Sequence, residues 1–144
     1  MIVTYFDSSA LVKLVLPELG TEEARAVWDV TGSCVTSWLT SAETAAALGA
    51  AHRSKRLSRS GFRRSMDLLD QAESGMVHVR VTEPVARLAA ELAVRHSLRG
   101  ADAVQLASAL LIGGDPVFAC WDERLRRGAA AEGLILAPAV VDGA

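Results

Sequence analysis

The sequence predicts an α/β fold, a three-layer α/β/α sandwich around a mainly parallel sheet of about five strands. Short β-rich apolar runs alternate along the chain with longer stretches whose hydrophobic residues recur at helical spacing. Proline and glycine, as at Pro17 and over residues 113–116, separate these runs. A chain of 144 residues is about the size of one domain, so we expect a single domain over residues 1–144.

The first half of the chain alternates strands and helices and then continues with a pair of helices. In order, we expect a strand at 1–6, helices at 8–16 and 21–30, a strand at 33–36, and helices at 44–48 and 61–72. Pro17 ends the first helix, and Glu22 and Glu23 favour the dipole at the start of the second. Small alanine side chains allow the third helix to pack closely on its neighbours.

The second half of the chain continues this alternation. In order, we expect a strand at 76–81, helices at 83–93 and 103–112, a strand at 117–121, a helix opening at 122–127, and a strand at 134–136. Residues 76–81 alternate as a strand does, and Pro84 fits a first helical turn, where its missing N–H costs nothing. The helix at 103–112 is nearly uncharged, so we expect it to be deeply buried.

Four acidic residues share one kind of position in this scheme. Asp7 follows the first strand, Glu43 lies at the start of the helix after the second, Asp102 opens the uncharged helix, and Asp122 follows the fourth strand. In open parallel sheets, ligands bind beyond the carboxyl ends of the strands. Clustered carboxylates repel one another unless a cation lies between them, and oxygen ligands suit Mg²⁺ or Mn²⁺. The sequence therefore predicts a metal site formed by these four acids.

Each acid also has a structural explanation. Asp7 and Asp122 fit helix N-caps, and Asp102 fits an ordinary acid in a first helical turn. Residues 40–43 fit a capping box, in which Glu43 reaches back to the backbone N–H of Thr40. Capping and metal binding are both open interpretations at this point.

Charge is segregated along the chain. No acid lies between Glu43 and Asp67, whereas this interval holds six basic residues. They are Arg53, Lys55, Arg56, Arg59, Arg63 and Arg64. Without them the formal net charge of −2 would be −8. The run is either a solvated helical face or a rim that binds phosphates.

Other classes of protein fit less well. The longest uncharged apolar stretch, 103–114, is shorter than the ~20 residues of a membrane span. The N-terminus lacks the features of a signal peptide, so we expect a cytoplasmic protein with no membrane association. Cys34 and Cys120 have no second Cys or His at ligand spacing, which argues against zinc, and we expect both to be buried in strands. The three histidines are scattered, so an imidazole acid–base pair has little support.

Four segments resemble the motif blocks of PIN-domain proteins, in order and at ordinary spacing. They are YFDSSALVKL (5–14), TSWLTSAE (36–43), LRGADAVQLA (98–107) and WDERL (121–125). The similarity is closest to VapC-type toxins of toxin–antitoxin pairs and covers essentially the whole chain. It implies a Mg²⁺- or Mn²⁺-dependent endoribonuclease, usually a homodimer. The family's acidic residues correspond to Asp7, Glu43, Asp102 and Asp122.

The resemblance also implies partners. We expect an RNA substrate and a VapB-like antitoxin, whose helix would lie in an apolar groove between the helices at 9–16, 21–30 and 61–72. The candidates for binding RNA phosphates are Lys13, Arg53, Arg59, Arg63, Arg64 and Arg99. Hydrolysis by water would leave a 5′-phosphate and a 3′-hydroxyl.

One departure from the family's pattern concerns the last motif. Cys120 stands where many members have threonine, and Trp121 stands where a small residue is common. The missing hydroxyl puts metal affinity in doubt more than the class of reaction. The main rival is a PIN-like module that binds RNA or protein without cutting, against which the four intact acids count. A receiver-like phosphoacceptor domain would need paired acids after the first strand and a lysine after the last, which this chain lacks.

Overall fold

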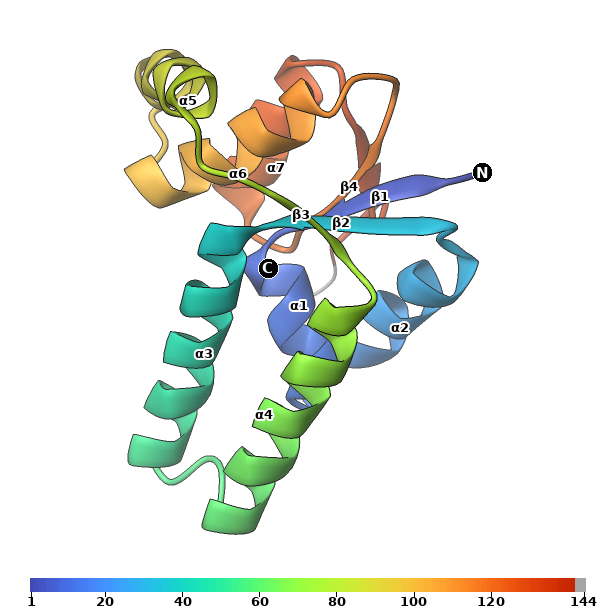
Figure 1. The fold of residues 1–144 in the computed structure, drawn as a ribbon, viewed down its shortest axis with the longest axis vertical. Helices are drawn as coiled ribbons and strands as arrows, with labels where there is room; N and C mark the ends of the chain where they lie inside the picture. The colour runs from blue at the N-terminus through green and yellow to red at the C-terminus, as the bar shows by residue number, and fades with distance from the viewer. Residues whose placement is uncertain (142–144) are drawn as a thin grey trace.

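The structure, a computed structural model that describes residues 1–141, has a five-stranded parallel sheet between two layers of helices (Figure 1). The strands are β1 (Val3–Phe6), β2 (Ser33–Ser37), β3 (Val77–Val79), β4 (Val117–Ala119) and β5 (Ile135–Ala137). Their order in the sheet is β3-β2-β1-β4-β5, and every neighbouring pair is parallel. Because β1 is central, Asp7 leaves the sheet in the middle of its carboxyl edge.

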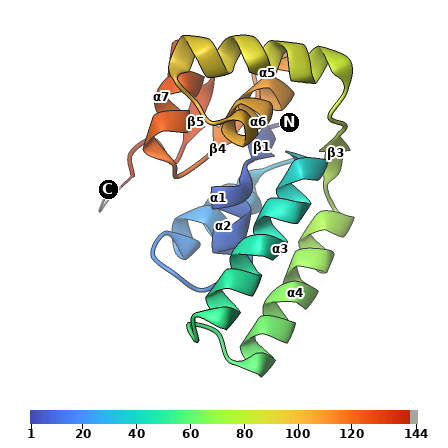
Figure 2. The same ribbon diagram turned by 90° about the vertical axis from the view of Figure 1, so that its left-hand side faces the viewer.

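Helices cover both faces of the sheet (Figures 1 and 2). They are α1 (Ser8–Val15), α2 (Thr21–Val30), α3 (Trp38–Arg53), α4 (Arg59–Ser74), α5 (Glu83–His96), α6 (Gly100–Leu111) and α7 (Glu123–Ala131). One hydrophobic core joins the sheet to α5, α6 and α7, and a second joins it to the helices α1 to α4. The predicted three-layer α/β/α fold is confirmed.

Alternation along β1 divides the two cores. Tyr5 and Phe6 are both fully buried, and they point to opposite faces because successive strand residues do so. Tyr5 stacks on Phe118 of β4, with ring centroids 5.6 Å apart, on the face covered by α5 to α7. Phe6 packs with Leu11 and Leu48 on the other face. The central strand is thus buried on both sides, as parallel sheets require.

Two helices begin earlier than the sequence pattern predicts. α3 begins at Trp38 because the Ser37 hydroxyl caps it by accepting a hydrogen bond from the N–H of Leu39. The helix expected over 44–48 is therefore the middle of a helix of 16 residues, and Glu43 lies in its second turn. α6 begins at Gly100, which puts Asp102 inside its first turn.

The helices α3 and α4 form a long hairpin that extends away from the sheet (Figure 2). The basic stretch of residues 53–64 spans the end of α3, the turn and the start of α4. Its side chains therefore lie at the tip of this hairpin. Within residues 1–141, no helix has both the length and the apolar character that a membrane crossing requires.

Candidate active site

The four predicted acids line one pocket of about 420 Å³ at the carboxyl edge of the sheet. Asp7 follows β1 and Asp122 follows β4, while Glu43 projects from α3 and Asp102 from the first turn of α6. The four side chains thus face a common pocket, as the sequence predicts for the carboxyl edge of a parallel sheet. The pocket joins residues more than 100 positions apart in the sequence, because β1 and β4 are neighbours in the sheet.

Asp7 is the most buried of the four acids, with 2% of its surface exposed. Its Oδ1 accepts hydrogen bonds from the hydroxyl of Ser9, at 2.7 Å, and from the backbone N–H of Ala10, at 2.9 Å. Burial raises the pKa of Asp7 to about 6, although both hydrogen bonds act to lower it, and the charge of Asp102 adds to the rise. Asp7 is therefore a desolvated carboxyl group held in one orientation.

Asp122 and Asp102 lie at the starts of α7 and α6, respectively, and both line the pocket. Oδ1 of Asp122 caps α7 by accepting from the N–H of Leu125 at 2.9 Å. Burial raises the pKa of Asp102, and the charge of Asp122 adds to this rise, whereas Arg99 lowers it. The Nε of Arg99 lies 3.4 Å from Oδ2 of Asp102.

Asp7 and Asp122 are both N-caps, as one interpretation of the sequence predicts. Each cap uses only one oxygen of the carboxylate, so the second oxygen can still bind a metal ion.

Glu43 does not form the capping box that residues 40–43 suggested. The N-cap of α3 is Ser37, three residues before Thr40, so Thr40 is not the residue at which the helix begins. Oε1 of Glu43 instead accepts a hydrogen bond of 2.7 Å from the side-chain amide of Gln105 on α6. The capping interpretation was wrong because α3 begins about one turn before the segment that resembles a capping box.

The donor set fits a hard divalent cation. All four side chains offer carboxylate oxygens, and within residues 1–141 no salt bridge reaches Asp7, Glu43 or Asp122. No three acid, histidine or cysteine side chains of this part of the chain are close enough to enclose a metal ion by themselves. Such an open arrangement suits Mg²⁺, which keeps several waters and commonly takes only one or two carboxylates.

Ser9 and Gln105 are site residues that sequence reasoning missed. The Ser9 hydroxyl donates to Asp7 and accepts from the backbone N–H of Trp121 at 2.9 Å, and it lies 3.8 Å from Sγ of Cys120. In the sequence, Ser9 has no feature beyond its place two residues after Asp7. The signal for Gln105 is stronger, since it is an amide inside an otherwise apolar stretch of helix.

Cys120 stands where many members of the family that the motifs resemble have threonine. Cys120 is fully buried just beyond β4, and its Sγ lies 3.7 Å from the carbonyl oxygen of Asp122. Burial raises the pKa of Cys120, so this thiol stays neutral. Both cysteines are free. The prediction that both are buried within strands holds in part for each, since Cys34 lies in β2 but is only half-buried, and Cys120 is buried but follows the end of β4.

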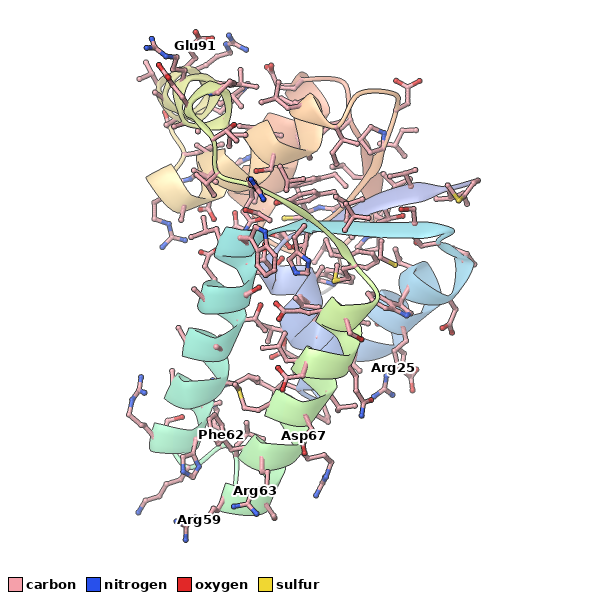
Figure 3. The ribbon with its side chains drawn as sticks, viewed as in Figure 1. Arg25, Arg59, Phe62, Arg63, Asp67 and Glu91 are labelled. Atoms are coloured by element: carbon pink, nitrogen blue, oxygen red, sulfur yellow. The ribbon has the colours of Figure 1, made fainter. Side chains whose placement is uncertain are left out.

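The predicted phosphate-binding residues fall into two groups. Lys13 and Arg99 line the acidic pocket, but Nζ of Lys13 already contacts Glu18, at 3.0 Å, and the carbonyl oxygen of Leu19, at 2.9 Å. The other four lie at the hairpin tip, where Figure 3 labels two of them. These four are Arg53, Arg59, Arg63 and Arg64. Arg53 follows Glu43 by ten positions along α3, which is roughly 15 Å of helix.

Comparisons with known proteins cover nearly the whole chain. A family model described as PIN domain matches residues 4–131. Ribonuclease VapC45 of Mycobacterium tuberculosis (strain CDC 1551 / Oshkosh) and ribonuclease VapC49 of Mycobacterium tuberculosis (strain ATCC 25618 / H37Rv) are each 43% identical to this chain over 144 residues. Each match covers 99% of this chain and 99% of the relative.

Solved structures share the fold at lower identity. The Mycobacterium tuberculosis toxin VapC20, described as cleaving the sarcin–ricin loop, is 19% identical, with a TM-score of 0.70 over 92% of this chain and 96% of that one. A chain in the crystal structure of VapBC-5, a toxin–antitoxin system of Mycobacterium tuberculosis, is 17% identical, with a TM-score of 0.61 over 94% of this chain and 96% of that one. At these identities the likeness is one of fold.

Proposed function

We propose a function from one premise: the chain belongs to the PIN-domain family, as its motifs, its fold and its relatives agree. It is an endoribonuclease and the toxin of a VapBC-type toxin–antitoxin pair. The observation that carries this proposal is the pocket in which four carboxylates from distant segments meet, three of them without a cationic partner in residues 1–141. Full-length identity of 43% to two ribonucleases supports the same reaction class.

The proposed cofactor is Mg²⁺ or Mn²⁺. Asp7, Asp102, Asp122 and Glu43 would be its ligands, some directly and the others through water, because their oxygens line the pocket and hard divalent cations prefer such ligands. When bound, the cation supplies Lewis acidity towards water and towards the oxygens of a phosphodiester. Burial raises the pKa of the Asp7 carboxyl, and a bound cation would act against this rise.

The protein's own side chains supply orientation and charge. Ser9 and the N–H of Ala10 fix the carboxylate of Asp7, and the N–H of Leu125 fixes that of Asp122. Arg99 lies beside Asp102 with an exposed side chain, so it can leave this contact to bind a phosphate of the substrate. Hydrolysis by water at such a site leaves a 5′-phosphate and a 3′-hydroxyl.

Selectivity for RNA over DNA must come from contacts away from the reacting phosphate. Hydrolysis by water does not use the 2′-hydroxyl, so the site itself does not separate RNA from DNA. A second pocket of about 480 Å³ shares Asp102 and Asp122 with the first and is lined by Arg99, Arg124 and Arg127. We propose that these arginines, with Lys13, bind the phosphates near the cleaved bond, and that the hairpin tip binds a more distant part of the RNA.

An antitoxin partner completes the proposal. A groove of about 310 Å³ lies between α1, α2 and α4, lined by Leu14, Val15, Trp28, Leu68 and Ala72 among others. It suits the apolar face of an amphipathic helix. Because α1 also borders the acidic pocket, a following basic segment could reach Asp7 and Asp102 and exclude the cation. We further propose that the protein forms a homodimer, as the resemblance implies, and that it acts in the cytoplasm.

Metal-dependent cleavage of RNA by the purified protein tests this proposal. We expect Mn²⁺ or Mg²⁺ to start cleavage, EDTA to stop it, and the new 5′ ends to carry phosphate. The control is Asp102→Asn, which keeps the shape of the side chain and removes its charge. RNA binding without cleavage at any concentration of either metal would favour the rival interpretation, a PIN-like binding module.

A further inference from the structure

A buried amide connects the core of the protein to the acidic pocket. Gln105 of α6 is fully buried, and its side chain makes three hydrogen bonds to three different residues. Its Oε1 accepts from the hydroxyl of Tyr5, at 2.5 Å, and from the hydroxyl of Thr40, at 3.1 Å. Its Nε2 donates to Oε1 of Glu43 at 2.7 Å. Segments β1, α3 and α6 therefore meet at one side chain.

These partners fix the direction of the amide. Tyr5 is fully buried, and its phenolic O–H donates to the amide oxygen. A flipped amide would place its oxygen against the carboxylate of Glu43, which accepts hydrogen bonds but cannot donate one when ionised. The amide nitrogen must therefore face Glu43, and the two hydroxyls keep it there.

Packing alone does not explain an amide at this position. The neighbours of Gln105 along α6, such as Leu106 and Ala107, are fully buried and apolar, and an apolar side chain would fill the same space. Burying an amide is costly unless it is hydrogen-bonded. Here the hydrogen bonds also have a direction, from the core outwards to a carboxylate that lines the pocket.

We propose that Gln105 is a positioning residue of this site, which holds one oxygen of Glu43 so that the carboxylate keeps a fixed place in the pocket that Asp7 and Asp102 also line. This inference rests on the proposed nuclease function. Gln105 follows Asp102 by one helical turn, and Tyr5 precedes Asp7 by two residues, so the network is attached to the same elements that carry two of the other acids. Ligand side chains in metal sites commonly depend on such outer partners.

The test replaces Gln105 by methionine, which has a similar length and no hydrogen-bonding amide. We expect Gln105→Met to weaken Mn²⁺ binding, measured by calorimetry, and to lower kcat, each by roughly 10- to 100-fold, with little change in KM for RNA. In a Glu43→Ala background the same substitution should have no further effect, because the residue through which it acts is gone. Leu106→Met, a similar change at the next buried position, is the matched control.

A milder variant covers the case in which Gln105→Met does not fold. Tyr5→Phe removes one hydroxyl and keeps the ring that stacks on Phe118, and it should lower Mn²⁺ affinity and kcat in the same direction, by less. Equal losses with and without Glu43 would overturn the role, as would a Gln105→Met protein that binds Mn²⁺ like the wild type. Wild-type protein that neither binds Mn²⁺ nor cuts RNA would overturn the proposed function itself.

Discussion

The hydroxyl of Ser9 donates a 2.7 Å hydrogen bond to Oδ1 of Asp7. The same hydroxyl oxygen accepts from the backbone N–H of Trp121, at 2.9 Å. One serine therefore ties the junction of β1 and α1 to the segment between β4 and α7, where Asp122 begins the last helix. It fixes the most buried acid of the pocket and the loop that carries another.

Replacing Ser9 by alanine should harm both stability and activity. Ser9→Ala leaves the N–H of Trp121 without its partner and frees one side of the Asp7 carboxylate. We expect a loss of about 1 kcal/mol in the free energy of unfolding, the usual net contribution of a hydrogen bond, because the Trp121 N–H is only partly buried. Cleavage should fall roughly tenfold. Urea unfolding and RNA cleavage assays measure the two effects, and an alanine variant with wild-type values for both would contradict the linking role.

Replacing Asp7 by asparagine should stabilise the metal-free protein at neutral pH. The pKa of Asp7 is raised from 3.8 to about 6 by burial, so the folded state binds its proton more tightly than the unfolded state does. The stability contributed by the protonated form is present below pH 4 and is lost as the pH rises towards 6. At about 1.4 kcal/mol for each pKa unit, the ionised group costs about 3 kcal/mol above pH 7.

Thermal unfolding in EDTA measures this difference. Asp7→Asn should unfold at a higher temperature than the wild type at pH 7.5, and the gap should close at pH 4. The asparagine side chain still offers an oxygen to the N–H of Ala10, so the cap of α1 is kept. Addition of Mn²⁺ should raise the melting temperature of the wild type only. A variant less stable than the wild type at pH 7.5 in EDTA would show that Asp7 is not destabilising.

The sequence was sufficient for the layered fold and for the meeting of the four acids. The alternation of strands and helices predicts a parallel sheet, and a parallel sheet brings Asp7 and Asp122 to one edge whatever the loops do. The hydrogen bonds of Gln105 could not be predicted in this way. They depend on how α3 and α6 pack against β1, which no local pattern records.

The extent of α3 was the other feature that the sequence left undetermined. Its start depends on Ser37, whereas Thr40 and Ser41 offer equally good caps in the sequence. Placing the start at Thr40 makes Glu43 a capping residue and shortens the helix. The observed helix of 16 residues instead carries Arg53 about 15 Å away from Glu43, so the distance between the basic stretch and the acids follows from that one choice of cap.

Replacing Glu43 by glutamine now has a clear expected outcome. Because Ser37 and not Glu43 caps α3, Glu43→Gln should not weaken the start of the helix. We expect its melting temperature to lie within about 2 °C of the wild type, as for most substitutions outside the core. Glutamine can still accept the hydrogen bond from Gln105, but it lacks the charge that a cation needs. Cleavage should fall by at least about tenfold, with weaker Mn²⁺ binding. Wild-type cleavage by this variant would remove Glu43 from the proposed ligand set.

Introducing a charge into the groove between α1, α2 and α4 should weaken antitoxin binding and leave RNA cleavage unchanged. Leu68 lines this groove with 37% of its surface exposed, so Leu68→Glu should fold normally and cut RNA at the wild-type rate. Its affinity for the antitoxin, measured by calorimetry with the co-expressed partner, should fall by at least about 100-fold because an apolar helix face would meet a carboxylate. Val94→Glu, at an exposed position on α5, is the control. Unchanged antitoxin binding by Leu68→Glu would place the partner elsewhere.

The hairpin tip offers a test of RNA contacts that leaves the acids untouched. Arg59 and Arg63, both labelled in Figure 3, line a pocket of about 330 Å³ together with Phe62 and His52. The rings of His52 and Phe62 stack with their centroids 5.1 Å apart. If both arginines bind phosphates, changing both to glutamine should reduce the slope of log affinity against log salt by about 1.4, at roughly 0.7 for each contact with single-stranded RNA. Changing Arg80 and Arg87 to glutamine removes the same charge from the exposed surface outside the tip and should leave the slope nearly unchanged. Equal slopes for the two double variants would make the tip a solvated helical face.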